Sequence, residues 1–191
     1  ALTVALVNVE DSAAAHAADI CLSLHAGPEL SVAATKSFIV SLVAGAAIVA
    51  HWLDRKDLLA AIEALPGQLA TATRIDWPEA IDLALRAESL YVVARGPSLP
   101  IASETALKLK ETCATHADAY SIAEVMHGPL ELLGKGFPVL AYSPEDGARQ
   151  SSRISLGKMR QAGANVLVAE EGGLPFVRTG NTLLDPISMI Q

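Results

Sequence analysis

The sequence predicts an α/β protein with parallel sheets, and three observations support this fold class. Apolar residues make up 51% of the 191 residues but aromatic ones only 4%, a composition that suits helices packed on a buried parallel sheet. Several short apolar runs rich in β-branched residues have the length of strands buried on both faces. Between residues 89 and 169 such runs alternate with helical patterns in the order β-α-(α)-β-α-β, which is typical of a doubly wound sheet.

The first part of the chain shows a shorter version of this pattern. Apolar runs at 2–9 and 19–24 predict two strands, with a short helix or turn at 11–16 between them. A long helix is expected over about 32–53. Its stretch 37–53 has no Asp, Glu, Lys or Arg, yet it is shorter than the roughly 20 residues that cross a bilayer. We therefore expect a buried helix of a soluble protein there, with a subunit interface as one way to bury it.

Further helices are predicted in the middle of the chain. One begins at Asp57, and Pro66-Gly67 is expected to break or kink it. Another, at 77–87, begins with a proline near its first turn. The expected organisation is a partial α/β unit at 1–54, a helical connector at 55–88 and a nearly complete α/β unit at 89–191.

The last unit has the clearest element pattern. Strands are predicted at 89–94, 137–142 and 165–169, and helices at about 100–115, 120–127 and 144–162. Gly163 is expected to end the last of these helices at its C′ position. Both ends of the sequence look cut, because it starts in a strand-like run and stops in the first turn of a helix.

Charge and cysteine usage exclude several functional classes. The net charge is −7, and no cluster of cations is longer than a pair, which argues against a nucleic-acid partner. Cys21 and Cys113 are isolated, with no CxxC spacing, which predicts a reducing, cytoplasmic location and no structural metal. No leader-like segment opens the chain.

A polar turn follows the predicted strand at 89–94. Ligands of open parallel sheets bind beyond the carboxyl ends of the strands, and Arg95-Gly96-Pro97-Ser98 occupies such a position. The Ser98 hydroxyl and the amides at the start of the next helix are candidates for binding an anion such as phosphate. The alternative is an ordinary strand-to-helix turn.

The helix at about 100–115 carries the strongest chemical signal. Glu104, Lys108 and Glu111 are spaced i, i+4 and i+7, so they share one helix face, opposite an apolar face that includes Ala102, Ala106, Leu109 and Cys113. A solvated stripe with Glu–Lys pairing is the alternative. Because the chain is poor in charge and the helix starts at the ligand end of a sheet, we favour a carboxylate that shuttles protons beside a lysine.

A second polar pair follows this helix. Glu124 and His127 are spaced i, i+3, and Gly128-Pro129 stops the predicted helix just after the histidine. An imidazole at a helix C-terminus can act as an acid–base group, and a surface capping histidine is an equally good interpretation. No two histidines form a metal-like pair backed by a carboxylate.

Four stretches give the sequence a family resemblance. They are Glu104-Thr-Ala-Leu-Lys-Leu-Lys-Glu-Thr-Cys113, His116-Ala-Asp-Ala-Tyr120, Ala123-Glu-Val-Met-His-Gly-Pro129 and His25-Ala-Gly-Pro-Glu-Leu-Ser-Val-Ala-Ala-Thr-Lys-Ser37. The last resembles the signature AGxExxVAxTKxF. On these motifs the sequence is similar to the sugar isomerase (SIS) family. That family includes the isomerase half of glutamine–fructose-6-phosphate aminotransferase and SIS-type glucosamine-6-phosphate deaminases.

The resemblance implies a fold, an assembly and a chemistry. The fold would be a tandem pair of flavodoxin-like SIS lobes, three-layer αβα with parallel sheets, of which the first is incomplete in this chain. The lobes would form a homodimer with shared active sites, and the substrate would be a sugar phosphate. Neither a metal nor another cofactor is implied, because one carboxylate can move the proton between C1 and C2 of the sugar.

The resemblance also implies roles for individual residues. Glu111 would be the base, and His127 would assist ring opening, in many members in the neighbouring subunit's site. Lys108 and Glu104 would position hydroxyls and tune Glu111. The residues expected at the sugar pocket are Val32, Thr35 and Lys36.

Two departures from the family pattern bear on the reaction. Ala34 replaces a serine, and Met126 a basic residue, that are common in the synthases. The family's phosphate loop would precede residue 1, and its C-terminal tail would follow Gln191. We therefore expect a phosphosugar isomerase or deaminase. The alternatives are the isomerase domain of a glutamine-dependent fructose-6-phosphate aminotransferase and a non-catalytic regulatory module that binds a sugar phosphate.

Overall fold

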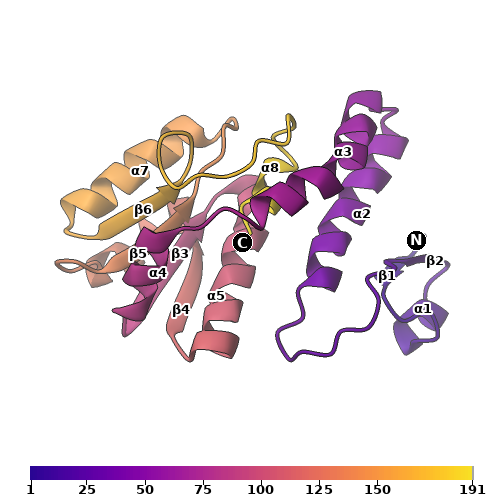
Figure 1. Cartoon of the computed structure of the whole chain (residues 1–191), viewed down its shortest axis with the longest axis horizontal. Coiled ribbons are helices and arrows are strands. Elements are labelled where there is room, and N and C mark those ends of the chain that lie inside the picture. The colour runs from indigo at the N-terminus through magenta and orange to yellow at the C-terminus, as the bar shows by residue number, and fades with distance from the viewer. Residues whose placement is uncertain (191) are drawn as a thin grey trace. The chain divides into compact units, whose positions relative to one another are not determined.

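The structure is a computed structural model that describes residues 1–190 (Figure 1). The chain divides into two compact units, the first ending at Glu63 and the second beginning at Ala64. This boundary falls inside helix α3 (Lys56–Ala72). The two units are therefore described one at a time.

The first unit contains a small parallel sheet. Strands β1 (Val4–Val7) and β2 (Ile20–Ser23) pair in parallel, and the short helix α1 (Ala13–Ala17) connects them. The Ser12 side chain caps α1 by accepting a hydrogen bond from the Ala15 amide at 3.3 Å. These elements confirm the strand–helix–strand pattern expected for this region.

Helix α2 (Lys36–Trp52) differs from its expected form in two ways. It begins four residues later than predicted, because residues 31–33 form a bend ahead of it. It is also half-buried in this chain rather than buried, since only Ala46 and Ala50 are buried and Trp52 is 83% exposed. Within residues 1–190 no helix is both long and apolar enough to cross a membrane.

Helix α3 continues through Pro66, so the predicted break is wrong. A proline inside a helix removes one backbone hydrogen bond, a cost of about 3 kcal/mol. Burial of Leu58, Leu65 and Ala72 along one side of this helix opposes that cost. The next helix, α4 (Pro78–Leu85), begins with its proline at the first turn, as expected.

The second unit is built on a four-stranded sheet. Its strands are β3 (Ser89–Ala94), β4 (His116–Ser121), β5 (Pro138–Tyr142) and β6 (Asn165–Ala169). All pairs are parallel and the order is β4-β3-β5-β6. Helix α5 (Leu99–Cys113) connects β3 to β4, and α7 (Arg149–Gln161) connects β5 to β6. These parallel sheets with flanking helices confirm the predicted fold class.

Two helices cover opposite faces of this sheet. Ala141 belongs to a buried apolar cluster that includes Leu156 and Met159 of α7. The next residue, Tyr142, points the other way, because its hydroxyl forms a 2.9 Å hydrogen bond with Thr105 of α5. Adjacent residues of a strand face opposite sides of a sheet, so α5 and α7 form two outer layers around it.

Strand β4 was not predicted. The sequence pattern instead suggested one helix over 120–127, where the structure has the end of β4 followed by α6 (Ile122–Val125). The sequence of β4 has no apolar run, because the strand lies at the sheet edge and only Ala117 in it is buried.

Several short elements complete the second unit. Two 3-10 helices, η1 (Gly96–Ser98) and η2 (Pro129–Leu132), lie before α5 and after α6. The last element is α8 (Asp185–Ser188). Helix α7 begins at Arg149, later than the predicted start at Pro144. Gly163 follows it with a φ of 105°, which agrees with the predicted C′ position.

Candidate active site

Helix α5 carries the candidate catalytic residues along its length, from Glu104 in its first half to Glu111 near its end. Ile101, Ala102 and Ala106 are at most 2% exposed and anchor the helix in the core. Cys113 was expected on this apolar face but is exposed, because it lies in the last turn of the helix. Glu104 lies among the buried residues, 8% exposed, so the charged face is not an ordinary solvated stripe.

The three charged residues of α5 form one array. The Lys108 Nζ lies 2.9 Å from Glu104 Oε1 and 3.1 Å from Glu111 Oε2. The exposed fractions of the three side chains are 10% for Glu104, 21% for Lys108 and 25% for Glu111. The spacing therefore predicted their proximity correctly, and the structure adds a gradient of burial along the array.

The array holds Lys108 in its charged form. Burial lowers the pKa of the Lys108 ammonium, but hydrogen bonds and charge attraction from both glutamates outweigh it and leave the pKa above its usual 10.5. Glu104 Oε1 is buried 2.9 Å from the Lys108 Nζ, so the ion pair with Lys108 is what offsets its charge. The array as a whole has one negative charge more than it has positive charges.

A cavity of about 560 Å³ opens beside Lys108 in the second unit. Its walls come from α4, α5 and the strands β3 and β5, and they include Trp77, Thr105 and Tyr142. Burial raises the pKa of Tyr142 to about 12, so its hydroxyl stays protonated and bonds Thr105. Thr105 donates in turn to the Ile101 carbonyl at 2.8 Å, which leaves Tyr142 as the donor between them. Sequence reasoning missed this pair, because Thr105 and Tyr142 are 37 residues apart and only the packing of α5 on the sheet brings them together.

Glu124 and His127 have separate environments. The Glu124 carboxylate accepts a hydrogen bond from the Ser121 amide at 3.1 Å and completes a capping box at the start of α6. His127 is exposed beyond the end of α6. Within residues 1–190 no hydrogen bond or ion pair joins the His127 side chain to the array on α5.

Ser98 lies in η1 between β3 and α5, at the position where an anion site was considered. It is 0% exposed, and its hydroxyl has no hydrogen-bond partner among the described residues. Arg95 in the same turn donates to the Ser151 hydroxyl of α7 at 2.9 Å, so its guanidinium links the turn after β3 to the first turn of α7.

The candidate sugar-contacting residues of the first unit lie just before α2. Val32 is 91% exposed, and Thr35 donates its hydroxyl proton to the Ala33 carbonyl at 3.2 Å. The Lys36 Nζ turns back to donate to the Pro28 carbonyl at 2.9 Å. All three belong to one short segment of the first unit.

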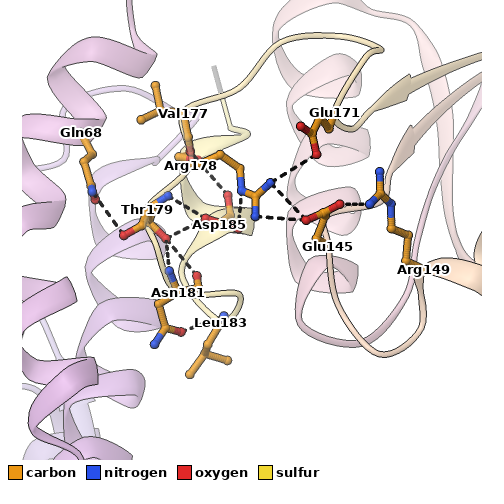
Figure 2. A network of polar contacts seen from close by, with 11 residues as sticks. Gln68, Glu145, Arg149, Glu171, Val177, Arg178, Thr179, Asn181, Leu183 and Asp185 are labelled. Carbon is orange, nitrogen blue, oxygen red and sulfur yellow. Dashed lines mark hydrogen bonds and ion pairs between the residues drawn. The ribbon is translucent and has the colours of Figure 1, made fainter.

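A polar network that sequence reasoning missed orders the segment before α8 (Figure 2). Asp185 is 1% exposed and accepts hydrogen bonds from the amide and hydroxyl of Thr179 at 2.7 and 2.8 Å. Arg178 lies 3.4 Å from Asp185 and from Glu145, and 3.8 Å from Glu171 (Figure 2). Because three carboxylates surround Arg178, this network stabilises the fold rather than presenting a free cation.

The fold and the matched motifs define the class of this protein. The second unit has the parallel α/β architecture of a SIS domain, and the SIS domain family model matches residues 85–169, which span β3 to β6. Residues 85–169 therefore form a SIS domain, which confirms the resemblance seen in the sequence.

Related sequences carry a consistent name. Glutamine–fructose-6-phosphate aminotransferase (isomerizing) from Zymomonas mobilis is 31% identical over 96% of this chain and 32% of its own length. The enzyme of the same name from Aquifex aeolicus is 37% identical over 76% of this chain and 25% of its own length. The chain thus spans about a third or less of these relatives.

Solved structures agree with the fold. A candidate phosphosugar isomerase from Silicibacter pomeroyi superimposes with a TM-score of 0.91 and 43% identity, over all of this chain and 60% of that one. The C-terminal domain of glucosamine-fructose-6-phosphate aminotransferase from Francisella tularensis gives a TM-score of 0.74 and 26% identity, over 98% of this chain and 61% of that one. The chain is thus similar to proteins named as a phosphosugar isomerase and as an aminotransferase, and it shares their fold.

Proposed function

We propose that this chain is part of a phosphosugar isomerase or deaminase that moves a proton between C1 and C2 of an open-chain sugar phosphate. The observation that carries the proposal is the Glu104–Lys108–Glu111 array, in which one ammonium lies within 3.1 Å of two carboxylates. Such an array offers a carboxylate base beside a fixed positive charge.

Glu111 is the proposed proton shuttle. Its side chain is the most exposed of the array, so it is the carboxylate that substrate reaches most easily. Glu111 would take the C2 proton of the open-chain aldose and return it to C1, which converts the aldehyde into a ketose. For an amino sugar the product is a C2 imine, and water then hydrolyses it to the ketone with release of ammonia.

Lys108 and Glu104 support this step in different ways. The Lys108 ammonium, kept protonated by both carboxylates, stabilises negative charge that develops on the sugar oxygens during enolisation. Glu104, the most buried of the three, fixes Lys108 from the side of the core. Both are positioned by α5, which packs on β3 through Ile101 and Ala102.

The remaining site residues extend the proposal beyond this array. His127 is exposed, which suits a role in ring opening within a neighbouring subunit's site of a homodimer. Val32, Thr35 and Lys36 would contact the sugar, and Ser98 stays a candidate for its phosphate. A cytoplasmic location agrees with the two free thiols, Cys21 and Cys113.

The second candidate function is the isomerase part of a glutamine-dependent aminotransferase. It is favoured by the aminotransferase name shared by relatives that are 31–37% identical. In that reaction fructose 6-phosphate and ammonia derived from glutamine give glucosamine 6-phosphate. The proton transfer at Glu111 is the same step in the reverse direction. A regulatory sugar-phosphate-binding module would leave the array on α5 without a purpose.

The test uses the full-length protein. Incubated with glucosamine 6-phosphate, it should release ammonia and fructose 6-phosphate, and Glu111→Gln should lower the rate by about 10²–10⁴-fold. Glu88→Gln, which changes an exposed carboxylate outside the array, is the matched control. A second reaction with fructose 6-phosphate and glutamine separates the deaminase from the aminotransferase. Unchanged turnover in Glu111→Gln, or sugar-phosphate binding without turnover, would contradict the proposed function.

A further inference from the structure

Glu29 occupies the N-terminus of helix α2 in the first unit. Thr35 lies at the N-cap position of this helix but makes no capping hydrogen bond with its side chain. The Glu29 Oε1 instead accepts a hydrogen bond from the Ser37 amide at 2.7 Å. A carboxylate at this end of a helix satisfies a free amide and opposes the positive end of the helix dipole.

Three other hydrogen bonds fix the chain on the N-terminal side of Glu29. The Asn8 side chain accepts a hydrogen bond from the Ala26 amide at 2.9 Å and donates to the Gly27 carbonyl at 2.7 Å. Gly27 has a φ of 71°, a conformation that glycine adopts at low cost. The Lys36 Nζ donates to the Pro28 carbonyl. Both ends of the segment 28–37 are therefore held by hydrogen bonds.

The middle of this segment has little apolar packing. Leu30 is 93% exposed and Val32 is 91% exposed, so burial of these side chains does not hold the backbone in place. The Ser37 amide is the largest influence that lowers the pKa of the Glu29 carboxyl below its usual 4.5, which keeps it ionised at neutral pH. Glu29 is thus the charged contact that closes the loop onto α2.

We propose that Glu29 is a positioning residue for sugar binding: its carboxylate closes the segment 29–37 and holds Val32 and Thr35 in their binding conformation without touching the sugar. This inference rests on the proposed function, which assigns Val32 and Thr35 to the sugar pocket. It has a further consequence for substrate binding. Because Glu29 already occupies the N-terminus of α2, the substrate's phosphate group binds elsewhere.

Two variants of Glu29 and one matched control test the proposal in the full-length protein. Glu29→Ala removes the acceptor and the charge, while Glu29→Gln keeps an oxygen that can accept from Ser37. Asp19→Asn is the control, because Asp19 also lies in the first unit, accepts a backbone amide at 2.8 Å and has a lowered pKa, but binds Thr3 instead. The affinity for glucosamine 6-phosphate is measured by calorimetry, and KM and kcat are measured separately.

The expected result is a split between binding and turnover. Glu29→Ala should weaken binding and raise KM by about tenfold with kcat nearly unchanged, the pattern of lost uniform binding. Glu29→Gln should restore most of the affinity, and Asp19→Asn should bind like the unmodified protein. If Glu29 had only a structural role, all three variants would be less stable and Glu29→Gln would not restore the affinity.

Other outcomes separate the inference from the proposed function. If Glu111→Gln loses turnover while Glu29→Ala binds normally, the role of Glu29 is wrong and the proposed function stands. A rise in KM of the same size in Asp19→Asn would also overturn the inference, since it would reflect general loosening of the first unit. If the unmodified protein does not bind glucosamine 6-phosphate or fructose 6-phosphate, the proposed function fails and the inference with it.

Discussion

The two units hold their candidate residues in place by different means. In the second unit, β3 is a central strand whose residues from Leu90 to Ala94 are at most 2% exposed, and α5 packs on it. In the first unit the paired strands are largely exposed, with Val4, Ile20 and Leu22 between 40% and 48% exposed. There the candidate segment depends on hydrogen bonds that Lys36 and Asn8 donate and that Glu29 accepts.

This difference predicts which of the candidate residues keep their conformation when a neighbouring side chain is mutated. The array on α5 keeps its geometry as long as the apolar core is intact, because helix position is set by many small contacts. The segment 28–37 depends on a few directional bonds, so a single side chain can change its conformation. Mutations made in each unit and measured side by side test this interpretation.

The largest effect on stability should come from the buried face of α5. Ile101 is 0% exposed, and Ile101→Ala should lower the free energy of unfolding by about 2–5 kcal/mol through lost burial and a new cavity. Leu22→Ala in β2, at a side chain already 40% exposed, should cost under about 1.5 kcal/mol. Urea unfolding of both variants provides the comparison. Equal losses would show that the first unit depends on apolar packing as much as the second.

An intermediate effect is expected at Lys108, and it depends on pH. Lys108→Met leaves Glu104 buried without its counter-charge and should cost about 1–3 kcal/mol at pH 8. Because the pKa of Lys108 is raised in the folded state, its stabilisation is complete below the unfolded value near 10.5 and is lost as pH rises through the folded value. The difference between wild type and variant should therefore shrink at alkaline pH.

Lys110→Met is the matched control for this measurement, because Lys110 is an exposed neighbour on the same helix. It should change the free energy of unfolding by less than about 0.5 kcal/mol. A difference between wild type and Lys108→Met that stays constant between pH 8 and 11 would contradict the assigned role of the ammonium.

The smallest effect should come from the capping box of α6. Glu124→Ala removes the acceptor for the Ser121 amide and should cost about 1 kcal/mol, with the sugar-phosphate turnover unchanged. Unfolding and activity are measured on the same preparation, with Glu131→Ala in η2 as an exposed control. Loss of turnover in Glu124→Ala alone would give this carboxylate a role in the reaction.

The sequence predicted elements well where burial leaves a pattern. The strands at β3, β5 and β6 are apolar runs because the sheet is covered on both faces there. Strand β4 escaped prediction because it is an edge strand whose polar residues, such as His116 and Asp118, break the apolar pattern. Helix α3 passes through Pro66 because tertiary packing overrides a local preference that the sequence alone indicates.

For the candidate site residues, too, the sequence predicted what local spacing decides and missed what tertiary packing decides. Helical spacing was enough to bring Glu104, Lys108 and Glu111 together, since i, i+4 and i+7 positions of one helix must neighbour each other. Spacing could not reveal that Glu104 is buried, because that depends on how α5 lies on the sheet. The contact between Glu29 and Ser37 was equally invisible, because it depends on the bend at 31–33.

The strand order of the second unit has a consequence for how the chain folds. Strand β3 is the first of the four in the sequence, and each later strand pairs directly with one already made: β4 on one side of β3, then β5 on its other side, then β6 on β5. During synthesis the sheet can therefore grow outward from its centre, and no strand has to insert between two others. The helix with the Glu104–Lys108–Glu111 array leaves the ribosome directly after β3, so it can dock on the growing sheet before β5 and β6 exist.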